Sequence, residues 1–113
     1  VGDRQQEPAE IRTTLYIVAQ LNLLHGCYFY RTNTGAAKTA LGFVRFGVPG
    51  QSDIMGCAAG RYVAIEVKKS NGKQSTLQKK FQERIESAGG IYILARTLDD
   101  AIEPVRALIA NAK

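Results

Sequence analysis

The chain contains 113 residues, of which 45% are hydrophobic and 22% are charged, a size and composition typical of one globular domain. Its 15 Lys and Arg against 10 Asp and Glu give a net charge of +5, which favours polyanionic partners such as nucleic acids. No apolar run reaches the roughly 20 residues of a membrane-spanning helix, and the polar start of the chain does not resemble a secretory signal. We therefore expect a single cytoplasmic domain, residues 1–113, without membrane contact.

The cysteine and histidine content argues against a thiolate or imidazole metal centre. Cys27 and Cys57 lie far apart in apolar segments, and His25 is the single histidine, so neither a zinc site nor a disulfide framework is indicated. We predict that both cysteines are reduced core residues. His25 is predicted to cap a helix or to lie on the surface.

The first third of the chain predicts a helix followed by strands. Pro8 is suited to a first helical turn, and the helix is expected to end at His25–Gly26. Residues 27–31 (CYFYR) predict a strand, residues 32–41 a loop, and residues 42–46 a short strand. The expected buried face of the helix comprises Ile11, Leu15, Val18 and Asn22, with Ala19 and Leu23 beside it.

The remaining elements complete an α/β fold. Residues 52–57 and 61–68 predict a hairpin that turns near residues 58–60. A helix is expected from Ser75, a buried strand at residues 91–95, and a last helix from Thr97 that Pro104 kinks or restarts. With the short strand at residues 42–46 left aside, the predicted order is α-β-β-β-α-β-α, a mixed β-sheet flanked by helices.

The second strand of the hairpin carries an acidic and a basic residue on one face. Strand alternation places Glu66 and Lys68 together, with Ile65 and Val67 directed to the core. If Ala59 and Gly60 form a two-residue turn, Asp53 lies directly across from Glu66 on that same face, whereas a slip of one residue would reverse the arrangement.

Two carboxylates brought together in this way indicate a divalent cation between them. Mg²⁺ takes oxygen ligands and several waters, and such an ion activates water and polarises the phosphoryl oxygen in phosphodiester hydrolysis. Lys68 is positioned to stabilise charge that develops on the phosphate. The alternative is that Glu66 and Lys68 form only an exposed ion pair of small energetic value.

The order of these features resembles the PD-(D/E)xK nuclease superfamily, and most closely its virus-type replication-repair (VRR) nuclease branch. The resemblance covers about residues 8 to 103 and includes RTNTGA (31–36), GVPGQSD (47–53), IEVKKSNGKQSTLQKKF (65–81) and the Gly89–Gly90 entry to a strand. It implies a restriction-endonuclease-like core, a metal-dependent nuclease activity, and a bacterial or phage-infected cell as the setting.

The resemblance also implies roles for individual residues. Asp53 and Glu66 match the metal-binding acids, the backbone carbonyl of Val67 adds a ligand, and Lys68 matches the catalytic lysine. Gln78 matches a glutamine that faces the active site, although Gln78 and Ser75 also form a capping-box pattern. Glu10, with Glu7 as the alternative, matches a glutamate on the first helix, although it would also complement the helix dipole.

The nucleic-acid surface is expected around this site. Its candidate residues, which contact phosphate and carry no sequence information, are Arg31, Asn33, Lys38, Arg45, Lys69 and Lys73. The function expected is a structure-selective DNA endonuclease that uses Mg²⁺ or Mn²⁺, acts as a homodimer and cuts branched DNA such as four-way (Holliday) junctions. The alternatives are a restriction-type or end-processing nuclease, a non-catalytic nucleic-acid-binding module, and a structural α/β protein.

Overall fold

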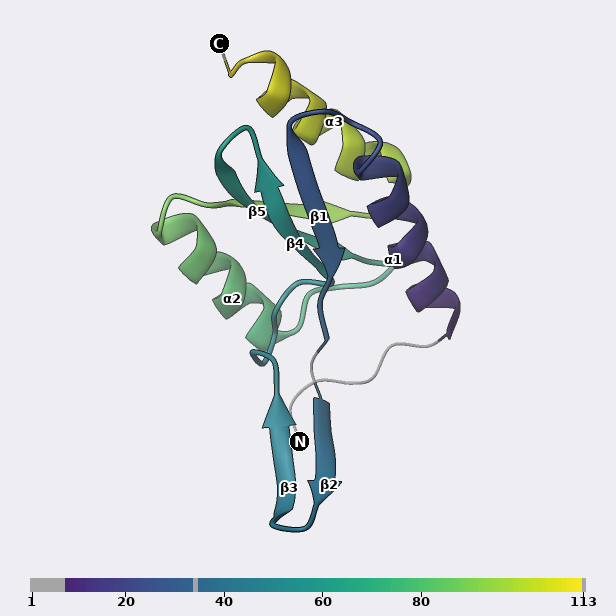
Figure 1. Ribbon diagram of the computed structural model, residues 1–113, viewed down its shortest axis with the longest axis vertical. Coiled ribbons are helices and arrows are strands. Elements are labelled where there is room, and N and C mark those ends of the chain that lie inside the picture. The colour runs from purple at the N-terminus through teal and green to yellow at the C-terminus, as the bar shows by residue number, and fades with distance from the viewer. Residues whose placement is uncertain (1–7, 34, 113) are drawn as a thin grey trace.

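A mixed four-stranded sheet forms the centre of the computed structural model, which describes residues 8–33 and 35–112 (Figure 1). The strand order is β1-β4-β5-β6; β1 pairs antiparallel with β4, β4 antiparallel with β5, and β5 parallel with β6. The strands are β1 (Cys27–Arg31), β4 (Ile54–Ala58), β5 (Arg61–Val67) and β6 (Ile91–Ala95). The parallel pair requires a crossover, and the helix α2 (Thr76–Ser87) supplies it.

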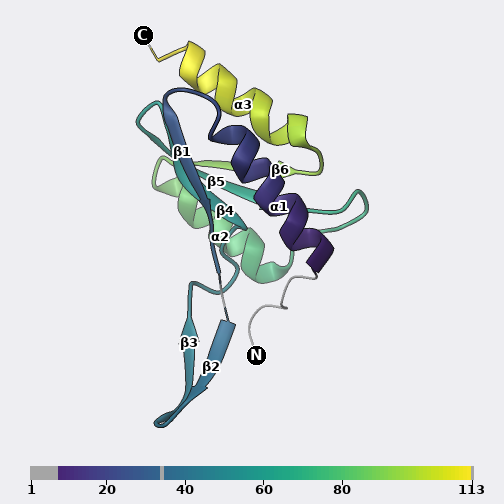
Figure 2. The ribbon, with the colours of Figure 1, turned by 45° about the vertical axis from the view of Figure 1, so that its right-hand side comes forward.

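Three helices flank the two faces of this sheet (Figure 2). The helices α1 (Pro8–Leu21) and α3 (Leu98–Ala110) cover one face, and the larger apolar core lies between them and the sheet. The helix α2 covers part of the opposite face through Phe81, which packs on Met55 and Ala64. The predicted α/β class and the order α-β-β-β-α-β-α are therefore confirmed for the main sheet and its helices, and the arrangement is compatible with a restriction-endonuclease-like core.

A second, two-stranded sheet departs from the predicted pattern. Residues 32–41 were expected to form a loop, but β2 (Gly35–Thr39) pairs antiparallel with β3 (Gly42–Phe46), the short strand that was predicted. The Thr39 hydroxyl donates to the carbonyl of Gly42 and accepts from the N–H of Leu41, which closes the turn. We call β2, β3 and this turn the arm, because they project from the body of the molecule (Figure 1).

The buried face of α1 also differs from the prediction. Thr14, Ile17 and Leu21 are the buried residues, whereas Leu15 is 49% exposed and Leu23 is 75% exposed. The expected face was right for Val18, which packs against the core, but wrong for Leu15 and Leu23. A polar residue, Thr14, takes a core position that the hydrophobic pattern assigns to its aliphatic neighbours.

Asn22 lies beyond the end of α1, and its role is not the core position that was expected. Its side-chain Oδ1 accepts from the N–H of Phe29 at 2.9 Å, and its Nδ2 donates to the carbonyl of Phe29 at 2.8 Å. The amide therefore takes the place of a neighbouring strand along the edge of β1.

Two smaller expectations are corrected as well. The helix α3 runs through Pro104 without restarting, since the buried residues Ala101, Ile102 and Val105 hold it against the core. Both cysteines are free, as predicted, but Cys57 is exposed rather than part of the core.

Over residues 8–33 and 35–112, no helix combines the length and apolar character that crossing a membrane requires.

Candidate active site

The predicted acidic pair comes together at one end of the main sheet. Ala59 and Gly60 both have positive φ, 52° and 79°, which is the geometry of a two-residue type I′ turn. The turn sets the register in which Ile54 pairs with Ile65. Asp53, the residue before β4, therefore lies opposite Glu66 of β5, as the sequence predicts.

Asp53 is held in a partly buried position by the neighbouring strand. Its Oδ2 accepts a hydrogen bond of 2.8 Å from the N–H of Val67. Burial raises the pKa of Asp53, and the bond from Val67, the contact with the Glu66 carboxyl group and the charge of Lys68 offset this only in part. The two carboxyl groups thus lie in hydrogen-bonding contact, where a shared proton or a cation is needed to offset their repulsion.

Glu66 is almost completely buried, with 3% of its side chain exposed. Its Oε2 accepts from the Gln78 side-chain amide at 2.9 Å and lies 3.8 Å from Nζ of Lys68, which is itself only 16% exposed. The alternative of a solvent-exposed ion pair between Glu66 and Lys68 is therefore wrong. A carboxylate removed from water in this way is costly unless compensated.

Gln78 serves both the helix and the acidic pair. Its backbone N–H donates to the Ser75 hydroxyl, and its side-chain Oε1 accepts from the Ser75 N–H at 2.8 Å, which completes a capping box at the start of α2. Because Oε1 faces that N–H, the Nε2 group is directed to Glu66. The Gln78 side chain therefore completes the capping box and also contacts Glu66 of the acidic pair.

The fit of a divalent cation rests on the acidic pair. In the described part of the chain, no three His, Cys, Asp or Glu side chains form a group that could hold a metal ion. Mg²⁺, however, is commonly held by one or two carboxylates together with waters, and Asp53 with Glu66 supplies this set. The N–H of Val67 donates to Asp53, and the N–H and C=O groups of one strand residue point to the same side, so the Val67 carbonyl is directed to the side of Asp53.

Glu10 approaches the pair but does not join it. It lies in the first turn of α1, and its negative charge contributes to raising the pKa of Asp53. Glu7, the alternative, lies outside the described residues. Glu10 is thus close enough to act on Asp53 electrostatically without being part of a three-acid cluster.

The predicted nucleic-acid residues surround this end of the sheet unevenly. Asn33 is exposed, and its carbonyl accepts from the Gln51 side chain at 2.8 Å. It follows Thr32, whose N–H donates to the backbone carbonyl of Asp53 at 2.9 Å. Arg31 is half-buried at the end of β1, where strand alternation places it on the α1 face with Phe29. It therefore does not share the face of the carboxylates.

The other predicted nucleic-acid residues lie on two projecting segments. Lys38 and Arg45 belong to β2 and β3 of the arm, and their side chains lie outside the described residues. Lys69 and Lys73 are exposed on the loop that connects β5 to α2. Both segments begin at the end of the sheet that carries Asp53 and Glu66.

No protein-family model matches the chain, and no curated protein gives a significant sequence match.

Two residues near the site were not predicted. Tyr92 of β6 is placed beside Ala64 by the parallel register, and its hydroxyl accepts from the Gln74 side chain at 3.2 Å. Burial, followed by the charges of Glu66 and Asp53, raises its pKa, so Tyr92 stays neutral beside the acids. The sequence did not single out Tyr92, because β6 is covered on both faces and its continuous apolar pattern does not distinguish one face from the other.

Arg96 organises the loop after β5. Its guanidinium donates to the carbonyls of Lys69, Ser70 and Gly72, at 2.6, 3.3 and 2.8 Å. The loop that carries Lys69 and Lys73 is thereby fixed to the end of β6. A basic residue directly after a buried strand was the available signal in the sequence.

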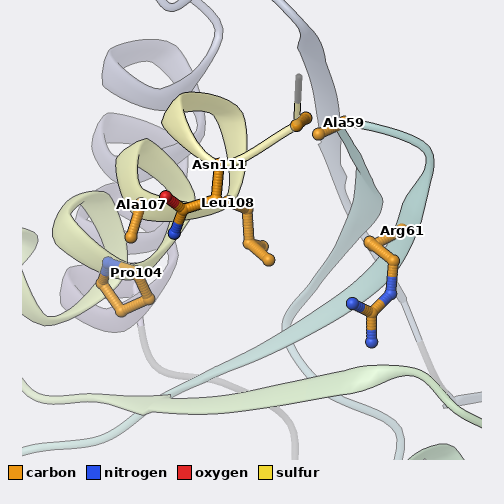
Figure 3. Close-up of a pocket in the computed structure, with 7 residues that line it drawn as sticks. Ala59, Arg61, Pro104, Ala107, Leu108 and Asn111 are labelled. Carbon is orange, nitrogen blue, oxygen red and sulfur yellow. The ribbon is translucent and has the colours of Figure 1, made fainter.

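A pocket elsewhere in the molecule is distinct from this site (Figure 3). It has a volume of about 420 Å³ and lies between the second half of α3 and the β4–β5 turn, with Arg61, Pro104 and Leu108 among its lining residues. Arg61 begins β5, five residues from Glu66, which corresponds to roughly 17 Å along the strand. None of its lining residues is acidic, so it does not share the chemistry of the carboxylate pair.

Gly50 lets the loop before Asp53 approach α2, and its substitution is expected to destabilise the site. A Cβ at Gly50 would lie 2.3 Å from the carbonyl oxygen of Leu77, and φ is +78°. We expect Gly50→Ala to lower the free energy of unfolding by more than the roughly 1–3 kcal/mol of backbone strain alone, measured by urea unfolding. Gly60→Ala is the matched control, because Gly60 has φ +79° and nothing within 4 Å of the added atom. An equal loss in the free energy of unfolding for the two variants would contradict the close approach of Gly50 to Leu77.

Proposed function

We propose that this chain is a metal-dependent deoxyribonuclease of the PD-(D/E)xK type, similar to the VRR branch, that cuts branched DNA with Mg²⁺ or Mn²⁺. The observation that supports it most is the contact between the carboxyl groups of Asp53 and Glu66, with the ammonium group of Lys68 beside them. Buried ionic groups of this kind usually stabilise a fold less than apolar residues of the same size. Their presence in one partly buried cluster therefore favours a catalytic role.

The role that we propose for each residue follows from its contacts. Asp53, Glu66 and the carbonyl of Val67 would hold the ion, which when bound polarises the phosphate and lowers the pKa of an attacking water. The N–H of Val67 orients Asp53, and the Gln78 amide orients Glu66. Lys68 provides a fixed positive charge where negative charge develops on the phosphate.

Two basic segments support DNA as the substrate. The arm carries Lys38 and Arg45, and the loop fixed by Arg96 carries Lys69 and Lys73. Both extend from the end of the sheet that holds the carboxylates, so phosphates on either side of the cut would meet positive charge. Contacts of this kind give affinity without base recognition, which suits a nuclease that selects the shape of its substrate.

The deciding experiment compares labelled four-way junctions, flapped DNA and linear duplex, with Mg²⁺ and with EDTA. We expect cleavage of the junction that requires the metal, and little cleavage of the linear duplex. Equal cleavage of linear duplex would favour a restriction-type or end-processing nuclease instead. Salt-sensitive DNA binding without cleavage in Mg²⁺ or Mn²⁺ would favour a non-catalytic binding module.

Variants of the capping box separate the two roles of Gln78. Gln78→Glu keeps a capping-box residue but replaces the hydrogen bond to the buried Glu66 with a second negative charge. We therefore expect lower thermal stability at neutral pH and cleavage slowed about tenfold or more. Ser75→Ala removes the N-cap while leaving the Gln78–Glu66 bond, so we expect a loss of about 1 kcal/mol in stability and nearly unchanged cleavage. Thermal unfolding and single-turnover cleavage measure the two effects. The same change in both measurements for the two variants would show that Gln78 only caps the helix.

We also propose that the chain acts as a homodimer. A four-way junction offers two symmetric strands, and each copy of the chain supplies one carboxylate pair. Sedimentation with and without a junction is expected to show two copies for each bound junction. A one-to-one complex that cuts both strands would contradict this arrangement.

A further inference from the structure

Three tyrosines form an exposed surface on the sheet face that α2 only partly covers. Tyr28, Tyr30 and Tyr62 are 68%, 48% and 47% exposed, and we call them the tyrosine surface. The rings of Tyr28 and Tyr30 have centroids 6.3 Å apart and are tilted by 34°. Tyr28 pairs with Cys57, which pairs with Tyr62, so these residues lie in one row across β1, β4 and β5.

These three rings contribute little to the packing of the fold. On this face α2 packs on Met55, Ala64 and Tyr92, which belong to β4, β5 and β6. The tyrosine surface lies beside that contact, toward β1, and its two β1 members belong to neither apolar cluster. Three half-exposed aromatic rings therefore face outward where a soluble surface favours charged side chains.

The tyrosine surface is continuous with the carboxylate pair. Tyr30 pairs with Met55, and Asp53 lies two residues before Met55, on the same face and about 7 Å further along the strand. The chain carries no Asp or Glu from Ile11 to Ser52, a segment that includes all of β1. A polyanion that follows β1 toward Asp53 thus meets no carboxylate from that part of the chain.

We propose that the tyrosine surface is a stacking platform for unpaired bases of the substrate, next to the phosphate that is cut. The bases of an intact duplex cover each other's faces, so only a base in a single strand, at a branch or at an end can lie flat on a tyrosine. Such stacking tolerates any base sequence. The proposal rests on the proposed nuclease function and narrows it to substrates with single-stranded character beside the cut.

Binding measured without metal tests this platform independently of cleavage. The probe is a fluorescein-labelled oligonucleotide of about 12 nucleotides, within the range that one small domain covers, compared in EDTA with a duplex of the same length. We expect the double variant Tyr28→Ala/Tyr30→Ala to weaken single-strand binding about tenfold or more and to leave duplex binding nearly unchanged. Tyr28→Phe/Tyr30→Phe keeps the rings and is expected to bind as the wild type does.

Tyr16→Ala is the matched control, because Tyr16 is 55% exposed on α1, away from the carboxylate face. Wild-type affinity of the double alanine variant for the single strand would overturn the proposal.

Sedimentation provides a second test, of whether another copy of the chain covers this surface instead. That alternative predicts that the wild type is a dimer, that the double alanine variant is a monomer, and that the DNA affinity of the two is the same. Intact single-strand binding alongside absent cleavage would reject the nuclease proposal and leave the platform standing.

Discussion

Replacement of Lys68 by alanine is expected to slow cleavage by about 100- to 1,000-fold, the loss that follows removal of one group that stabilises developing charge. The Lys68 ammonium lies 3.8 Å from Glu66 and is 16% exposed, so water screens its field less than that of a surface lysine. Single-turnover cleavage of the junction measures the loss. DNA binding in EDTA is expected to change by only a few fold.

A second measurement separates this role from a general effect on folding. The charge of Lys68 lowers the pKa of Asp53, so its removal raises that pKa and the carboxyl group ionises only at higher pH. The acid limb of the pH–rate profile is therefore expected to move to higher pH in Lys68→Ala.

Lys69→Ala is the matched control, because Lys69 is the neighbouring residue and is exposed. It is expected to reduce the salt dependence of DNA binding by about one phosphate contact and to leave the cleavage rate at saturation unchanged. Equal loss of cleavage in Lys68→Ala and Lys69→Ala would show that Lys68 is only part of a basic surface.

The geometry of the acidic pair was predictable because local rules determine it. A two-residue turn at Ala59–Gly60 fixes the pairing of the strands, and alternation then assigns Glu66 and Lys68 to one face. The capping boxes at Ser75 and Thr97 could also be predicted from the sequence, since each depends on residues three positions apart. These features required no knowledge of how distant segments pack.

The features that the sequence did not predict depend on tertiary contacts. The buried face of α1 was predicted only in part, because Thr14 occupies a core position while Leu15 is exposed. Only the packing of α1 against β1 and α3 decides this. Tyr92 reaches the acids because β6 pairs parallel with β5, a pairing that joins residues far apart in the chain. Arg96 likewise binds a loop more than 20 residues away.

Replacement of Asp53 by asparagine is expected to abolish metal-dependent cleavage and, without metal, to make the protein more stable at neutral pH. Asparagine keeps an oxygen that accepts from the N–H of Val67 but removes a charge from the contact with Glu66. The unfolded chain releases the Asp53 proton near pH 4, whereas burial holds it to higher pH in the folded protein. Between these two pKa values the folded state binds more protons, so the free energy of unfolding falls as the pH rises.

Thermal unfolding in EDTA across this pH range measures the effect. The wild type is expected to lose stability relative to Asp53→Asn from about pH 4 upward, with the full difference present above the folded-state pKa. Glu83→Gln is the matched control: Glu83 is exposed on α2, and this variant is expected to follow the wild type.

Addition of Mg²⁺ is expected to reverse the order of stability. At a concentration 100-fold above its dissociation constant, an ion bound only by the folded state adds about 2.7 kcal/mol, and the wild type gains this while Asp53→Asn does not. The reversal connects the repulsion of two carboxyl groups in the free protein to the cation that offsets it. Equal stabilisation of both proteins by Mg²⁺, or metal-dependent cleavage by pure Asp53→Asn, would show that Asp53 does not hold the ion and that the contact with Glu66 has another purpose.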